Sequence, residues 1–327
     1  MNTDAGRTLS IIAPSLDDKR IHPVRRLEPG TVHRTRAVLS HASGKGANAA
    51  RAAAALGGHV ELCALAGARL RALLEEQFAY SGVHLVLTDT AQETRSCITV
   101  LEEDGRATEF VQEALSIEED ERAEFTRLAL RTAAQDGVVL LAGSLPPGLA
   151  EDFYVICANQ AYGHGARVVI DAHRFPLRVA LAGHPDVVKI NREELIATVT
   201  DPLVNAFPAA AKPADTGTNA DGDTLLLAGT LIEWGARCVV VTDGSESVLL
   251  LEERKEAEFL SVPEVDVVNT VGSGDAMSGA LSLALLRGWP LRDAVRFGIA
   301  AGAANAATLL PGDIDPATVE ELFDAIP

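Results

Sequence analysis

The sequence VNTVGSGDAMSGAL at residues 268–281 joins a glycine turn to a helix that carries an acid near its start. Gly272, Ser273 and Gly274 can expose consecutive backbone N–H groups, and a helix N-terminus adds a partial positive charge. Asp275 supplies a carboxylate at the edge of this anion cradle. Phosphoryl transfer to a hydroxyl needs a group that binds developing negative charge beside one that accepts a proton. The alternative is an ordinary loop capped by an aspartate at a helix start.

A second glycine-rich stretch, SGKGANA at residues 43–49, fits the dinucleotide pattern G-x-G-x-x-A. A dinucleotide site needs a buried strand directly before the glycines and an acid at the end of the next strand. Here the preceding segment is polar, and Glu61 stands at the start of the next strand. Lys45 is followed by Gly46 and not by Ser or Thr, so the phosphate-loop pattern is absent. If ATP is used, we expect a fold other than a P-loop fold.

Composition predicts a soluble globular protein of one large or two ordinary domains. The 327 residues are 47% hydrophobic and 23% charged. The net charge of −18 argues against a nucleic-acid or anionic-membrane partner. We expect neither a signal peptide nor a membrane span. The cysteines lie far apart in apolar runs, so we expect buried free thiols in a reducing, cytoplasmic compartment; they are Cys63, Cys97, Cys157 and Cys238.

Short apolar strands alternate with helices along much of the chain, which predicts an α/β fold with a mostly parallel sheet covered on both faces. The expected strands are 8–13, 59–65, 137–141, 166–171, 186–190 and 238–242. One expected helix follows the glycines at 44–46 and ends at Leu56. The other expected helices cover 70–80, 119–134, 151–162, 191–198, 224–234, 275–286, 291–309 and 316–325. Residues 200–223 are rich in Pro, Ala, Asp, Thr and Gly, and we expect a long surface loop there.

Two segments interrupt this α/β pattern. Residues 19–40 alternate charged and apolar side chains and are broken by Pro29-Gly30, which favours an exposed antiparallel hairpin. Residues 94–101 and 107–111 form a second alternating pair, joined by a turn that contains Asp104-Gly105. We expect the two hairpins to meet as a small sheet beside the main domain.

The two glycine motifs, GKGAN at 44–48 and GSGD at 272–275, resemble the two signatures of the ribokinase-like (PfkB) family of carbohydrate kinases. GSLPPG at 143–148, KINREE at 189–194 and VTDG at 241–244 also agree, so the resemblance spans about residues 13–312. It implies one ribokinase-like domain over residues 1–327 with a three-layer α/β/α fold. The hairpins at about 19–40 and 93–112 would be the family's β lid, which covers the sugar and often forms a dimer contact. The resemblance therefore implies a homodimer that uses ATP and Mg²⁺.

Within this family the chain is most similar to the phosphosugar branch, which holds 1-phosphofructokinase, tagatose-6-phosphate kinase and the minor 6-phosphofructokinase. APSLD at 13–17 and GSLPPG are typical of that branch, and Glu93-Thr94-Arg95 places an arginine on the lid. A guanidinium fork suits a phosphate, although a solvated lid charge is the alternative for Arg95. The implied reaction is ATP-dependent phosphorylation of a ketohexose phosphate. Two alternatives remain: a kinase of an unphosphorylated sugar or nucleoside, since GKGAN also suits ribokinases, and a non-catalytic sugar-phosphate or nucleotide sensor.

The family's motifs imply a role for each matching residue on the sugar side. Asp275 would take the proton of the sugar hydroxyl, and Gly272, Ser273 and Gly274 would bind the transferring phosphoryl group through backbone N–H. The sugar hydroxyls would be bound by Asp17, Gly44 and Asn48, and the substrate phosphate by Arg95, helped by Lys45.

On the nucleotide side, Lys189 and Asn191 would face the ATP phosphates, and Thr242, Gly244 and the helix around Asn305 would line the adenosine. Asn191 and Glu194 would organise Mg²⁺ largely through water, with an ordinary helix-surface charge as the alternative for Glu194. A monovalent cation such as K⁺ stays an open possibility.

The sequence also departs from the family pattern at several places. Ser43 stands where the first of two glycines is usual, and Ile190 replaces a usual proline. Asp243 and Ser247 change the nucleotide turn, and the turn at 66–70 is short. These departures bear on substrate choice and nucleotide affinity more than on catalysis, because Asp275 and its glycine turn are intact.

Overall fold

The computed structural model describes residues 6–201 and 220–327, and these form two sheets. The larger sheet has nine strands in the order β13-β12-β11-β10-β9-β8-β1-β4-β5. From β11 to β5 neighbouring strands are parallel, while β12 and β13 extend the sheet in antiparallel pairing. The strands are β1 Leu9–Ala13, β4 Val60–Ala66, β5 Val83–Asp89, β8 Val138–Ala142, β9 Arg167–Asp171, β10 Val187–Asn191, β11 Cys238–Thr242, β12 Val248–Glu252 and β13 Glu258–Leu260.

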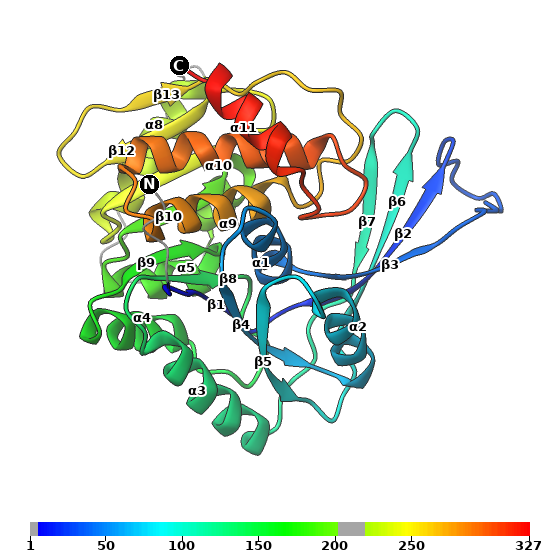
Figure 1. Cartoon of the computed structure of the whole chain (residues 1–327), viewed down its shortest axis with the longest axis horizontal. Coiled ribbons are helices and arrows are strands. Elements are labelled where there is room, and N and C mark those ends of the chain that lie inside the picture. Colours follow the sequence, from blue (N-terminus) through cyan, green and yellow to red (C-terminus); the bar gives the residue numbers. More distant parts are fainter. Residues whose placement is uncertain (1–5, 202–219) are drawn as a thin grey trace.

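Helices cover both faces of this sheet, as the alternation of strands and helices predicts (Figure 1). One face carries α1 Lys45–Ala55, α2 Ala68–Phe78, α9 Ser273–Leu286, α10 Leu291–Ala306 and α11 Pro316–Ala325. The other carries α3 Glu119–Ala133, α4 Phe153–Gly163, α5 Arg174–Ala180, α6 Arg192–Thr200 and α8 Ala220–Glu233. Successive strand residues point to opposite faces, so Ile11 packs in the first core and Ile12 in the second.

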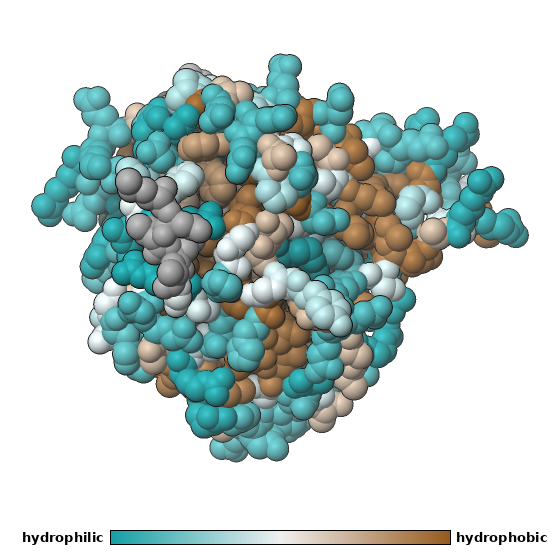
Figure 2. Space-filling model, viewed as in Figure 1, coloured by the Kyte–Doolittle hydropathy of each residue, from teal (hydrophilic) through white to brown (hydrophobic). Residues whose placement is uncertain are grey.

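The two expected hairpins are present and join in one four-stranded sheet, which we call the lid sheet. Its strands are β2 Asp17–Val24, β3 Leu39–Ser43, β6 Ser96–Glu102 and β7 Ala107–Val111. Each hairpin is antiparallel, and β2 and β6 pair in parallel in the middle of the sheet. The lid sheet projects from one side of the body (Figure 1). Figure 2 shows hydrophilic side chains over its tip and hydrophobic ones toward the body.

Several elements lie outside the sequence expectations. β5 is an edge strand in which only Val86 and Thr88 are buried, so it lacks the continuous apolar run of the inner strands. α5 contains Pro176, a residue that signals a helix break except in the first turn, where it stands here. The helix expected to reach residue 309 ends at Ala306. Most of the loop expected at 200–223 lies outside the described residues, and α8 already begins at Ala220.

The four cysteines are buried free thiols, as expected. Within residues 6–201 and 220–327, no helix has both the length and the apolar character needed to cross a membrane.

Candidate active site

The glycine turn at the start of α9 is held by its surroundings in a shape that only glycine allows. Gly272 has φ +84°, and a Cβ there would lie 2.6 Å from the Cβ of Pro311. A Cβ on Gly274 would lie 2.4 Å from Nζ of Lys189. The Lys189 ammonium therefore stands directly over the backbone of the turn, and cation, helix dipole and free N–H groups act on the same point.

Asp275 lies in the first turn of α9, beside this cradle. Its Oδ2 accepts a hydrogen bond of 2.8 Å from Nδ2 of Asn48 on α1. The buried Oγ of Ser43 in turn donates to Oδ1 of Asn48 at 3.2 Å, so this serine helps to orient Asn48. Burial, and next the negative charge of Asp171, raise the pKa of the Asp275 carboxyl above its ordinary value. Asp275 is thus a fixed carboxylate with increased affinity for a proton.

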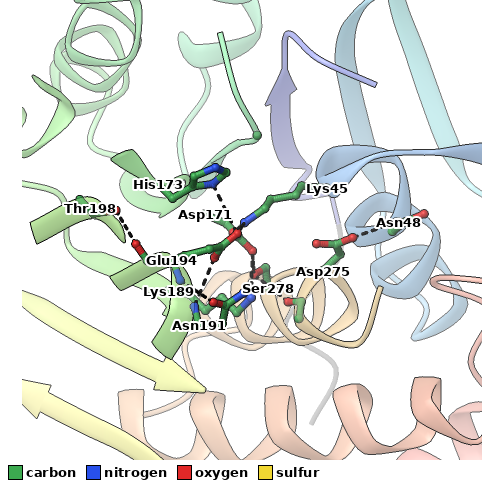
Figure 3. Close-up of polar contacts among 12 residues, drawn as sticks. Lys45, Asn48, Asp171, His173, Lys189, Asn191, Glu194, Thr198, Asp275 and Ser278 are labelled. Atoms are coloured by element: carbon green, nitrogen blue, oxygen red, sulfur yellow. Dashed lines mark hydrogen bonds and ion pairs between the residues drawn. The ribbon is translucent and has the colours of Figure 1, made fainter. Parts of the chain in front are cut away.

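Asp171, which the sequence motifs do not single out, is the centre of the site (Figure 3). It ends β9, is fully buried, and accepts from Nζ of Lys45 at 2.6 Å, Nζ of Lys189 at 3.2 Å and Oγ of Ser278 at 2.6 Å. Burial alone would raise the pKa of the Asp171 carboxyl, but the two ammonium groups and these hydrogen bonds hold it well below its ordinary value. This carboxylate fixes both lysines in place.

Lys45 connects Asp171 to the start of α6. Its Nζ also contacts Oε1 of Glu194 at 2.8 Å, and these two carboxylates keep the pKa of Lys45 above its ordinary value despite burial. Glu194 and Asn191 form a capping box: the Glu194 N–H donates to Oδ1 of Asn191 at 2.7 Å, and the Asn191 N–H donates to Oε2 of Glu194 at 3.3 Å. Nδ1 of His173 lies 3.3 Å from Oε1 of Glu194. Both expected magnesium residues therefore also serve to start α6.

The expected sugar residues lie where β2 leaves the body. Nε of Arg95 donates to Oδ1 of Asp17 at 2.5 Å, and burial raises the pKa of the Asp17 carboxyl. Gly44 has φ +102°, and a Cβ there would lie 2.8 Å from Cα of Leu16, so its role is close packing of two backbones. A cavity of about 50 Å³ beside the end of β1 is lined in part by Arg95 and by the loop at 114–117.

The expected nucleotide residues lie in two places, the ends of β10 and β11 and the underside of the glycine turn. Thr242 ends β11 directly opposite Asn191 on β10, and Gly244 follows in the turn with φ +58°. Asn305 is buried, and its Nδ2 donates to the Val271 carbonyl at 3.0 Å and to Oγ of Ser273 at 3.1 Å. The Asn305 side chain thus supports the glycine turn from below and does not face an open surface.

Among the described residues, no three His, Cys, Asp or Glu side chains gather in a way that could hold a metal ion. Asp171, Glu194 and Asp275 lie near one another, but the Lys45 ammonium stands between the first two. Ser278 and Asp171 are the functional candidates that motif reading misses. The available signal was an aspartate at the carboxyl end of an otherwise apolar strand, because a buried carboxylate requires a partner.

Comparisons with known proteins show the family of the chain. Residues 12–317 match the family model of the pfkB family carbohydrate kinases. The chain is 27% identical over 315 residues to tagatose-6-phosphate kinase of Staphylococcus epidermidis, covering 96% of each chain. It is 31% identical over 304 residues to ATP-dependent 6-phosphofructokinase isozyme 2 of Escherichia coli K12, covering 92% of each.

Among solved structures, phosphofructokinase-2 from Escherichia coli in complex with substrates and products superposes with a TM-score of 0.82. That match has 27% identity and covers 98% of this chain and 99% of the other. Arabidopsis thaliana ribokinase, at 20% identity and TM-score 0.71, shares the fold. The ribokinase-like α/β fold expected from the sequence is therefore confirmed, and the chain belongs to the PfkB family of carbohydrate kinases.

Proposed function

We propose that this kinase transfers a phosphoryl group from ATP to a hydroxyl of a ketohexose phosphate, giving a bisphosphate and ADP. The candidate substrates are fructose 1-phosphate, fructose 6-phosphate and tagatose 6-phosphate. Full-length relatives named for phosphosugar kinases, at 27% and 31% identity, support this class. The observation that carries the proposal is the Asp275 carboxylate beside a glycine turn that faces the Lys189 ammonium.

In this mechanism Asp275 accepts the proton of the substrate hydroxyl. Its raised pKa makes it a better acceptor than an exposed aspartate, and the hydrogen bond from Asn48 keeps one carboxylate oxygen in place. The transferring group is bound by the first N–H groups of α9, which have no carbonyl partner within the helix. The Ser273 N–H already donates to the Thr270 carbonyl at 3.2 Å, so Gly274 and Asp275 supply the open donors.

Arg95 is the proposed anchor for the phosphate that the substrate already carries. Its Nε bonds to Asp17, which leaves the two Nη groups without a hydrogen-bonding partner among the described residues. Lys45 has a supporting role, because its ammonium is already shared by Asp171 and Glu194. A guanidinium whose Nε is fixed presents the remaining donors in a defined direction toward a phosphate.

Lys189, Asn191, Thr242 and Gly244 are the proposed nucleotide residues. Asn191 and Glu194 fit a water-mediated Mg²⁺ site, since both present hard oxygen donors and the Glu194 side chain is 18% exposed. Bound Mg²⁺ would neutralise charge on the ATP phosphates. A structure of Escherichia coli phosphofructokinase-2 is described in complex with potassium, so assays should compare K⁺ with tetramethylammonium.

We also propose a homodimer formed through the lid sheet. Ile98 and Phe110 face each other across β6 and β7 and are 40% and 60% exposed, which leaves adjoining apolar side chains on an outer face. The solved relative from Escherichia coli is described in a tetrameric inhibited form. Sedimentation of wild type and Phe110→Asp tests the contact: a dimer that becomes monomeric is expected, and an unchanged mass would contradict it.

The substrate-phosphate assignment is tested with Arg95→Ala. A charge-assisted hydrogen-bond pair contributes about 1.5–3 kcal/mol, so KM for the phosphosugar should rise roughly 10- to 150-fold with a smaller change in kcat. Arg69→Ala is the matched control, because Arg69 binds the neighbouring Asp18 with Nη2 at 2.5 Å but has no assigned substrate role. An unchanged KM for Arg95→Ala, or an equal rise in both variants, would contradict the anchor.

A further inference from the structure

Pro311 and Gly312, in the loop between α10 and α11, fit tightly between the glycine turn and α1. A Cβ on Gly272 would lie only 2.6 Å from the Cβ of Pro311. A Cβ on Gly312 would lie 2.6 Å from the carbonyl oxygen of Asn48, whose side chain binds Asp275. A displacement of this dipeptide would therefore move the phosphate cradle or the partner of the catalytic carboxylate.

Hydrogen bonds fix the dipeptide from two sides. The Gly312 N–H donates to Oδ1 of Asn305 at 2.6 Å, and Asn305 also holds Ser273 of the glycine turn. On the other side, the Pro311 carbonyl accepts from Nη1 of Arg51 at 3.1 Å and lies 2.9 Å from Nε2 of His41. Burial lowers the pKa of His41 to about 3, so the ring is neutral at pH 7 and donates from Nε2 in this contact.

Arg51 connects this dipeptide to the base of the lid sheet. Its guanidinium stacks over the Phe78 ring at 4.8 Å, and Nη2 donates to the Ala42 carbonyl at 3.0 Å and to Oε1 of Gln77 at 3.2 Å. His41 and Ala42 belong to β3, which leads directly into the glycine at 44. Gln77 also accepts from the Ala42 N–H at 3.1 Å. The half-buried Arg51 guanidinium thus joins β3, the edge strand of the lid sheet, and α2 to the loop that supports the cradle.

We propose that Arg51, assisted by His41, is a positioning residue that couples the base of the lid sheet to the phosphate cradle. The proposal rests on the proposed function, because it takes the lid sheet as the sugar-binding side and the glycine turn as the phosphate-binding side. Sugar binding that shifts β3 acts on Ala42 and His41, and through Arg51 on the Pro311 carbonyl. Each substrate then changes the affinity of the other, and by linkage the two effects are equal in size.

The test compares Arg51→Gln with Arg296→Gln. Arg296 is a matched control: it stacks on Phe323 at 4.7 Å and donates to the backbone carbonyl of Ile326, but it lies on α10 away from the cradle. Both variants should lose similar stability in urea. Only Arg51→Gln should weaken binding of a non-hydrolysable ATP analogue at least fivefold, lower kcat at least tenfold, and abolish the effect of sugar phosphate on analogue affinity.

A second variant guards against failure of Arg51→Gln to fold. Gln77→Met removes one anchor of the guanidinium without touching the Pro311 carbonyl, and it should weaken analogue binding two- to fivefold in the same direction. Analogue affinity within twofold of wild type in both variants, or equal losses in Arg296→Gln, would overturn the proposal. Calorimetry of the analogue alone needs no sugar turnover. If the wild type phosphorylates only free sugars, the proposed function is refuted, but the affinity for the ATP analogue can still be compared between the variants.

Discussion

Replacing Asp171 by asparagine should be among the most damaging single changes in the site. Asp171 is fully buried, with a relative exposure of 0%. Its carboxylate is the ion-pair partner of Lys189, whose side chain is only 3% exposed. An asparagine can keep its oxygen toward Lys45, but its amide then faces the Lys189 ammonium. Leaving a buried charge without its partner costs about 3–5 kcal/mol. We expect about 3 kcal/mol, the low end of that range, because the Asp275 carboxyl also lies near Lys189.

Urea unfolding followed by circular dichroism measures this loss. Glu258→Gln is the control, because Glu258 binds Arg292 at 2.6 Å with both side chains at least 40% exposed, and exposed pairs contribute roughly 0–1 kcal/mol. We expect the Asp171 variant to lose stability well beyond this control and to lose activity because Lys189 shifts from the cradle. A loss of less than about 1 kcal/mol would refute the view that Asp171 holds the two lysines.

Three further outcomes follow from the same geometry. Gly274→Ala places a Cβ 2.4 Å from Nζ of Lys189, so kcat should fall at least roughly tenfold. The control is Gly163→Ala, whose Cβ would have no atom within 4 Å and which should leave kcat unchanged. Steady-state kinetics of the two variants test this prediction. Because Asp275 must be deprotonated to act as a base, kcat/KM should fall as pH decreases through its raised pKa, at a higher pH than for an exposed aspartate. Removing a stabilising cation with Lys45→Met should move that acidic limb to still higher pH, and an unmoved limb would contradict the assignment.

The sequence predicts the parts of the site that depend on local spacing. Gly272 and Gly274 have to be glycine because a Cβ on either would collide with the side chain of Pro311 or of Lys189, and glycines required in this way form a motif that can be read directly. Asp275 follows from the same motif. The two hairpins of the lid sheet are likewise visible as alternation, broken by Pro29-Gly30 in the first and by Asp104-Gly105 in the second, because side chains on a half-exposed sheet repeat every two residues.

Residues that act through distant partners are not predictable in this way. Asp171 binds Lys45 across 126 positions, and Arg51 binds the Pro311 carbonyl across 260, so neither pair leaves a short pattern. Asn305 shows the opposite problem: the resemblance places its helix near the adenosine, but the buried side chain bonds to the turn at 271–273. Only the packing of α9 and α10 reveals that supporting contact.

The most direct test of phosphosugar phosphorylation with Asp275 as base is ADP release with Mg-ATP by wild type and Asp275→Asn. The panel holds fructose 1-phosphate, fructose 6-phosphate, tagatose 6-phosphate, fructose, ribose and adenosine. We expect turnover of a phosphorylated ketohexose by wild type, and a loss of about 10²- to 10⁴-fold in kcat in a variant with unchanged circular dichroism. Turnover only of a free sugar or nucleoside, or a loss below about tenfold, would contradict the account.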